Sequence, residues 1–168
     1  MAIVVAQDFH LSQYDAAAIN INPAMTGMFS GAYRIHGHYR NQWSAISTRP
    51  FTTALIAADK SWGDWAGGVQ VANFNAGAGK FNVFAAQLSG SYDFALDQNG
   101  AHHIALGLAA GFIQKSIDQS ELYFGSQYQV SGGGYFDTSI PSGENFSNTS
   151  VGLHDVSGGL IYYYGGEY

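Results

Sequence analysis

The sequence contains no cysteine among its 168 residues. This absence excludes a disulfide framework, a thiol nucleophile and any cysteine-based metal site. Charged side chains are also scarce, at 11% of the residues against roughly 25% in a typical soluble protein. The 6 Lys and Arg residues are outnumbered by 12 Asp and Glu residues, and the net charge is −6. This balance gives no electrostatic basis for binding nucleic acid.

Proline is rare, and no apolar run approaches the 18 or more residues of a transmembrane helix. The chain is instead rich in aromatic and small residues, with 11 Tyr, 11 Phe and 22 Gly, although its mean hydropathy of −0.04 is neutral. Strands that alternate apolar and polar side chains give such an average, as in outer-membrane barrels. A soluble β-sandwich or a lipocalin-like barrel is the alternative, but these folds usually carry more Lys and Glu on the solvent-facing side.

Alternation with a period of two is clearest between Phe84 and Phe94. Every second residue there is large, apolar or Gly, whereas the residues between are Ala, Gln, Ser, Ser and Asp. Such a pattern predicts a strand with one apolar face and one polar face. In the later segment 102–115, one face consists of small residues, from Ala105 to Gly111, against which another segment could pack. We expect six strands in all, over residues 32–43, 51–58, 65–74, 81–96, 102–115 and 151–164.

Turn-forming residues separate these segments. The polar residues 59–64 predict a tight reversal, 75–79 predict a flexible connection, and 97–100 end in an Asn-Gly pair suited to a tight turn. Residues 7–29 predict irregular chain with a short helix that stops before Pro23. Residues 116–150 show no sustained period and predict a long loop, which is typical of one rim of an outer-membrane barrel.

These patterns together predict an all-β protein, an antiparallel transmembrane β-barrel of outer-membrane type. Six strands are fewer than the eight or so with which bacterial barrels begin, and an open edge in lipid leaves backbone groups unpaired. Either some strands escape this interpretation or the chain is a fragment, which we favour. The apolar residues 1–7 indicate the end of a signal peptide or a disordered N-terminus. Residues 8–168 would form the N-terminal part of a single β-barrel domain, an incomplete barrel.

The densest group of chemically capable side chains is on the first expected strand, where Arg34, His36, His38 and Arg40 share one face. Two histidines at this spacing could bind zinc. The flanking cations and the lack of a carboxylate in the same strand favour a second interpretation, the wall of a polar barrel lumen.

Other candidate sites are weaker. His102 and His103 follow a turn and point to opposite faces, so we interpret them as solvated turn residues. There is no Gly-x-Ser-x-Gly sequence of a serine hydrolase, and the acidic residues of the long loop lack EF-hand spacing. We therefore predict no catalytic, cofactor-binding or metal-binding residue.

Several short stretches have distinctive sequences. Residues 7–14 read Gln-Asp-Phe-His-Leu-Ser-Gln-Tyr, and 20–27 read Asn-Ile-Asn-Pro-Ala-Met-Thr-Gly. Residues 39–43, Tyr-Arg-Asn-Gln-Trp, are the most specific stretch, and 77–79, 122–127 and 141–146 add to it. Over nearly its whole length the chain thereby resembles the PorP/SprF family of bacterial outer-membrane proteins, which are associated with type IX secretion and gliding motility. Family members are longer and form a larger barrel, so this chain resembles their N-terminal half, with a shortened signal peptide.

The resemblance implies a non-enzymatic component or accessory of the type IX secretion or gliding machinery that supports export or surface attachment of cargo. The implied location is the bacterial outer membrane. The implied partners are outer-membrane lipid, other secretion-system proteins and secreted cargo, with no nucleic acid and no cofactor. Two alternatives stay open: a passive channel with the Arg/His face lining its lumen, and an outer-membrane enzyme with a site at the rim of the lumen.

Overall fold

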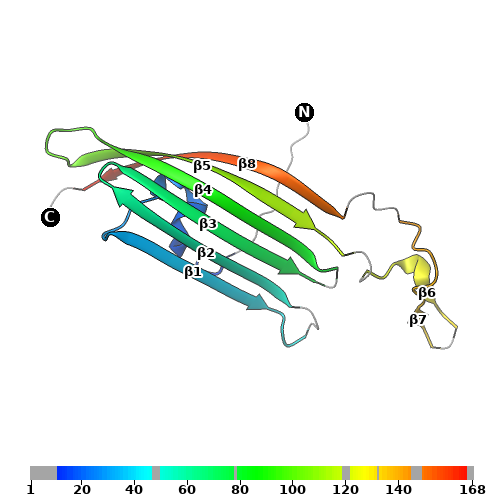
Figure 1. The fold of residues 1–168 in the computed structure, drawn as a ribbon. Coiled ribbons are helices and arrows are strands. Elements are labelled where there is room, and N and C mark those ends of the chain that lie inside the picture. The colour runs from blue at the N-terminus through cyan, green and yellow to red at the C-terminus, as the bar shows by residue number, and fades with distance from the viewer. Residues whose placement is uncertain are drawn as a thin grey trace.

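The main body of the protein is one six-stranded antiparallel sheet in the order β1-β2-β3-β4-β5-β8 (Figure 1). The computed structural model describes residues 11–46, 50–77, 79–118, 122–131, 133–144 and 149–165. In this sheet each strand from β1 to β5 pairs with the next strand in the sequence, and β8 pairs with β5 after the long loop. This open, barrel-like sheet confirms the predicted all-β class. The strands are β1 (Tyr33–Gln42), β2 (Phe51–Trp62), β3 (Trp65–Ala76), β4 (Phe81–Ala95), β5 (His102–Ser116) and β8 (Ser150–Tyr164).

The sheet has two chemically different faces. We call the face against which residues 11–29 pack the inner face, and the opposite one the outer face. Ala57 and Ala72 on the inner face are each 2% exposed, whereas Leu88 and Leu108 on the outer face are 67% and 70% exposed. The alternation predicted for residues 84–94 and 102–115 is therefore confirmed, with the apolar side of each strand turned outward.

The second strand is longer than predicted. The tight reversal predicted over residues 59–64 is present but its bounds are wrong, because β2 continues through Asp59 to Trp62, which pairs with Trp65. Only Gly63 and Asp64 form the turn, and Gly63 has a φ of 65°. A positive φ at the first of two turn residues suits a tight hairpin. The polar composition of the segment misled the prediction, since Asp59 and Ser61 face inward at alternate positions of a continuing strand while Lys60 faces outward.

The other two tight connections are at the expected places. At the β4–β5 turn, Gly100 has a φ of 63° and its N–H donates to the carbonyl of Asp97, which confirms the predicted turn. The His102 and Ala101 amides also donate to the Asp97 side chain and hold the pKa of that carboxyl below its ordinary value. Between β3 and β4, the strand extends to Ala76, so the connection is shorter than the predicted 75–79.

The long loop is largely irregular, as predicted, in the parts that the structure describes. It contains η4 (Gly125–Gln127) and a two-stranded pairing of β6 (Tyr128–Gln129) with β7 (Tyr135–Phe136). This small unit projects beyond the end of the six-stranded sheet (Figure 1). Among the described residues, no helix has the length and apolar character needed to cross a membrane.

The N-terminal segment (residues 11–29) crosses the inner face of the sheet in three short helical turns, η1 (Tyr14–Ala16), α1 (Ala18–Ile21) and η2 (Pro23–Met25). The Asn22 side chain accepts a hydrogen bond from the Ala24 N–H at 2.9 Å and so caps η2, whose first residue is proline. The predicted short helix ending before Pro23 is therefore confirmed. The signal-peptide prediction for residues 1–7 falls outside the described residues.

Candidate functional site

The N-terminal segment fits into a seat of small residues on the inner face. Ile19 packs with Leu55, Ala57 and Ala72 in a buried cluster. A Cβ added to Gly107 would overlap the backbone of η2. The prediction that the small face of 102–115 admits another segment is thus confirmed at this position.

The same close approach recurs along a line of glycines. A Cβ at Gly159 would overlap the Asn22 side chain, and one at Gly68 would lie 3.0 Å from Cδ1 of Ile19. Gly111 differs, because its Cβ would meet the Ala86 carbonyl of β4 rather than the N-terminal segment. The seat therefore depends on missing side chains in three strands, β3, β5 and β8.

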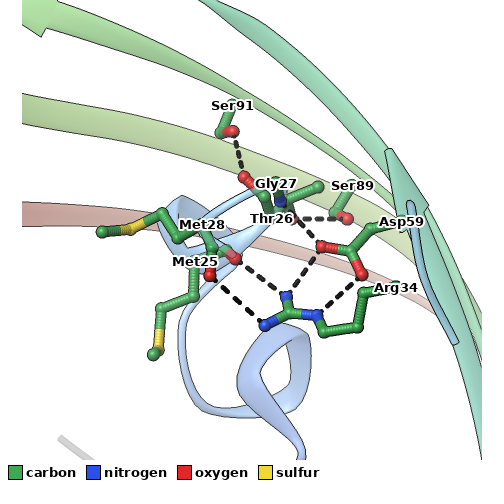
Figure 2. Close-up of polar contacts among 8 residues, drawn as sticks. All are labelled: Met25, Thr26, Gly27, Met28, Arg34, Asp59, Ser89 and Ser91. Atoms are coloured by element: carbon green, nitrogen blue, oxygen red, sulfur yellow. Dashed lines mark hydrogen bonds and ion pairs between the residues drawn. The ribbon is translucent and has the colours of Figure 1, made fainter. Parts of the chain in front are cut away.

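An ion pair fastens the segment where it leaves this seat (Figure 2). Arg34 of β1 donates to both carboxylate oxygens of Asp59 on β2, at 3.0 and 2.7 Å. The side chain of Asp59 is 0% exposed and that of Arg34 is 23% exposed. A planar guanidinium matches a carboxylate in this two-point geometry, which fixes orientation as well as charge.

Both members of the pair also hold the backbone of the N-terminal segment. The Gly27 N–H donates to Oδ2 of Asp59 at 2.7 Å, and Arg34 donates to the carbonyl of Met25 at 3.1 Å (Figure 2). Arg34 reaches the Met28 carbonyl as well, at 3.5 Å. The ion pair is therefore a latch between the sheet and the segment, with donors and acceptors matched on both sides.

Two serines of β4 complete this latch. The Thr26 hydroxyl donates to Oγ of Ser89 at 2.8 Å, and the Ser91 hydroxyl donates to the Thr26 carbonyl at 2.6 Å. Thr26 is only 1% exposed. We refer to Thr26, Gly27, Arg34, Asp59, Ser89 and Ser91 together as the polar latch (Figure 2).

Gly27 is the residue of the latch that tolerates no side chain. Its φ is 78°, a conformation that L side chains rarely adopt, and an added Cβ would overlap Cβ of Ala66. Gly27 is also the last residue of the stretch Asn-Pro-Ala-Met-Thr-Gly over 22–27, one of the stretches that resembles PorP/SprF. That stretch is therefore the part of the segment that enters the seat and closes the latch.

Replacing Thr26 by Val tests the contribution of the hydroxyl. We expect Thr26→Val to lower the free energy of unfolding by about 1 kcal/mol, because the isosteric change removes one buried hydrogen bond and leaves the Ser89 hydroxyl without it. Chemical denaturation in detergent measures this loss. Thr52→Val, the same change on the outer face, serves as the control. Equal effects of the two variants would contradict a specific role for Thr26.

The Arg/His face of β1 lies on the inner side, as the alternation predicted. His36 and His38 approach each other edge to face, with ring centroids 5.6 Å apart. Both ring nitrogens of His36 and Nε2 of His38 are buried without a hydrogen-bond partner among the described residues. Arg34 is not a lumen cation but a member of the latch. Among the described residues no group of three His, Asp or Glu side chains is placed to hold a metal ion.

The two histidines after the β4–β5 turn are more ordered than the sequence suggested. They do point to opposite faces and His102 is exposed, as predicted, but the assignment to a turn is wrong, because both lie in β5 and have specific contacts. His102 contacts the Tyr162 hydroxyl at 2.7 Å, and His103 contacts Asp93 at 3.1 Å. Tyr163 donates to Asp93 at 2.5 Å and stacks on His103. Asp93, His103 and Tyr163 thus form a second polar cluster that joins β4, β5 and β8 on the inner face, whereas His102 and Tyr162 meet on the outer face.

Sequence reasoning missed the central acid of the latch. Asp59 lies in the residues predicted to turn, and the strand before it is apolar on both faces, so the sequence there gives no alternation that places Asp59 on the inner face. The partnership of Asp59 with Arg34, 25 residues earlier, needs the register of β1 against β2, which pairs these two positions directly.

The arrangement is suited to holding a segment of the chain rather than to catalysis. Its carboxylate and guanidinium are paired with each other, and its hydroxyls are engaged with the segment backbone or with one another. The chain has no match among curated proteins or solved structures. The family model described as "Type IX secretion system membrane protein PorP/SprF" matches residues 3–168, which include every strand and the complete polar latch. The chain belongs to the PorP/SprF family of type IX secretion system membrane proteins.

Proposed function

We propose that the protein is a non-enzymatic outer-membrane component or accessory of the type IX secretion or gliding machinery, supporting export or surface attachment of cargo. The observation that carries this proposal is the family match over residues 3–168. The family is associated with type IX secretion and is described as membrane protein, which implies other secretion-system components as partners. We further propose that the membrane is the outer membrane and that the protein serves particular cargo proteins.

The outer face supports contact with lipid. Seven Lys, Arg, Asp and Glu residues lie within the six long strands, and the register places all but Lys60 on the inner face. A face of Leu, Val, Phe and Tyr side chains with one charge is the pattern of a lipid-exposed barrel surface. The six inner charges are Arg34, Arg40, Asp59, Asp93, Lys115 and Asp155.

The lengths of the connections support one orientation. The β2–β3 and β4–β5 turns are short and lie at one end of the sheet, whereas the long loop leaves from the other end. Outer-membrane barrels have short periplasmic turns and longer extracellular loops. We therefore place Gly63 and the 97–100 turn at the periplasmic side and the loop 116–150 outside the cell.

The two sheet edges support a larger barrel. Neither β1 nor β8 has a second strand partner among the described residues. In hydrocarbon each unpaired backbone group costs several kcal/mol, so barrels close on themselves. Residues 8–168 would then form part of a single β-barrel domain in which further strands pair with both edges.

The secretion role is tested by deleting the gene in its host and measuring the proteins released to the medium or attached to the surface. We expect cargo to be retained in the cell, and the intact gene to restore its export. Restoration by the intact gene but not by a Gly27→Val variant that still inserts would connect export to the latch. Unchanged export after deletion would sink the proposal.

The channel alternative is tested by conductance. The N-terminal segment covers the inner face across β3, β4, β5 and β8, which argues against an open water-filled lumen along these strands. In planar bilayers we expect no steady conductance from the intact protein. A steady, ion-selective pore would instead favour a passive channel.

A further inference from the structure

The outer face carries a single charge in an otherwise uncharged surface. Lys60 is exposed near the end of β2, and none of the ion pairs among the described residues includes it. Its Nζ lies 5.6 Å from the centroid of the Trp62 ring. An unpaired ammonium on a lipid-facing surface is costly near the midplane and far less so at the interface.

Lys60 lies at the level that aromatic side chains mark as the interface. Tyr33, its register partner on β1, is 70% exposed. Trp62 and Trp65 face each other at the same end of the sheet, and Tyr162 lies there on β8. Rings of this kind gather at the headgroup level of a bilayer. The Lys60 ammonium is therefore at the depth of lipid phosphates.

The same row of the register runs from Lys60 past Gly67, over which the Trp62 ring lies, to an apolar groove. Lys60 pairs with Gly67, Gly67 with Gly90 and Gly90 with Leu108. A groove of about 820 Å³ lies over Gly90, and its wall is the packed series Trp65, Tyr92 and Phe94 with ring centroids 4.7 and 4.4 Å apart. A smaller hollow of about 340 Å³ surrounds Lys60 itself, between Tyr33 and Gly67.

We propose that the outer face binds one anionic glycerophospholipid, with its phosphate on Lys60 and an acyl chain in the groove over Gly90. The Lys60 ammonium matches the phosphate of such a lipid, and the apolar groove matches its acyl chain. A protein partner with a complementary charged surface is not needed to account for these two features. The proposal rests on the membrane orientation given under the proposed function, since the periplasmic end faces the phospholipid leaflet. A Cβ at Gly90 would meet only the Ala66 carbonyl, at 3.7 Å, so a larger residue there would fill the groove without disturbing the sheet.

The test uses Trp65 as a fluorescent reporter in the groove. The protein with Trp43→Phe and Trp62→Phe is reconstituted in phosphatidylcholine vesicles that contain brominated phosphatidylglycerol or brominated phosphatidylcholine. Quenching of Trp65 gives the relative affinity of the two lipids. We expect the affinity for phosphatidylglycerol to be about fivefold higher than that for phosphatidylcholine. This ratio corresponds to the free energy of a modest ion pair at an interface. Lys60→Gln should abolish the preference, and Lys60→Arg should keep it.

Two matched controls separate the site from general effects. Lys115→Gln removes the same charge from the inner face and should leave the preference unchanged. Gly90→Leu should reduce quenching by either lipid, whereas Gly37→Leu, the same change on the outer face of β1, should not. The proposal is overturned if the parent shows no preference, if Lys115→Gln removes it equally, or if Gly90→Leu leaves quenching unchanged. Insertion is scored on the same vesicles by protease protection, so loss of the lipid site is distinguished from loss of membrane insertion.

Discussion

Asp59→Asn is expected to lower the free energy of unfolding by about 3–5 kcal/mol, the range for breaking one partner of a buried ion pair. The Asp59 side chain is fully buried, so its loss of charge leaves the Arg34 guanidinium without its counter-charge beneath the N-terminal segment. Asn keeps an oxygen that still accepts from the Gly27 N–H, so the change isolates the charge. Denaturant unfolding in detergent measures the effect.

A double-mutant cycle identifies the pair as the cause. Arg34→Gln alone should cost a comparable amount, and the double variant should cost much less than the sum, because the two charges act as one unit. Asp155→Asn, which neutralises another inner-face aspartate on β8, is the matched control and should cost less. Strictly additive costs of Asp59→Asn and Arg34→Gln would show that the two side chains do not act together.

The latch also predicts where the chain will open first. If Arg34 and Asp59 fasten the segment, Asp59→Asn should speed proteolytic cleavage within residues 11–29, because Arg34 loses the counter-charge that positions it to donate to the Met25 carbonyl. Limited proteolysis followed by mass spectrometry locates the cuts. New cuts confined to the loop 116–150 would place the weakest region elsewhere.

Leu88→Arg is expected to reduce insertion into bilayers by about 2–4 kcal/mol, the cost of an arginine near the midplane on a lipid-facing strand. Leu88 is central in β4 and 67% exposed on the outer face. The fraction of protein that folds into vesicles, resolved by heat-modified gel mobility, measures the loss.

Gln87→Arg is the control, one residue away on the inner face. Gln87 makes a long hydrogen bond, 3.4 Å, to the Ser157 hydroxyl, so little is lost when it is replaced. A guanidinium there joins the inner face, where six of the seven strand charges already lie. Equal losses for the two variants would contradict the assignment of the outer face to lipid.

The sequence by itself determined the strands and their faces. A period of two is a local property, because successive side chains leave a strand in opposite directions whatever the strand pairs with. The alternation over residues 84–94 and 102–115 therefore predicts the apolar side of each strand correctly. It also predicts the inner side for the face formed by Arg34, His36, His38 and Arg40. The stretches 20–27 and 39–43 also indicate the family whose model matches residues 3–168.

The tertiary structure alone decided what the inner face holds. The polarity of residues 59–64 favours a turn locally, but the pairing of Asp59 with Arg34 and of Lys60 with Gly67 keeps the strand extended to Trp62. The seat of Ile19 and η2 joins positions as far apart as Asn22 and Leu160, whose carbonyl the Asn22 amide reaches at 3.3 Å. A contact between residues 138 positions apart produces no periodic pattern in the sequence. It depends on the register of the strands and on the space that glycines leave for the segment. Local alternation thus fixed which side of each strand is apolar, while the fold decided that the other side closes over the chain's own N-terminal segment.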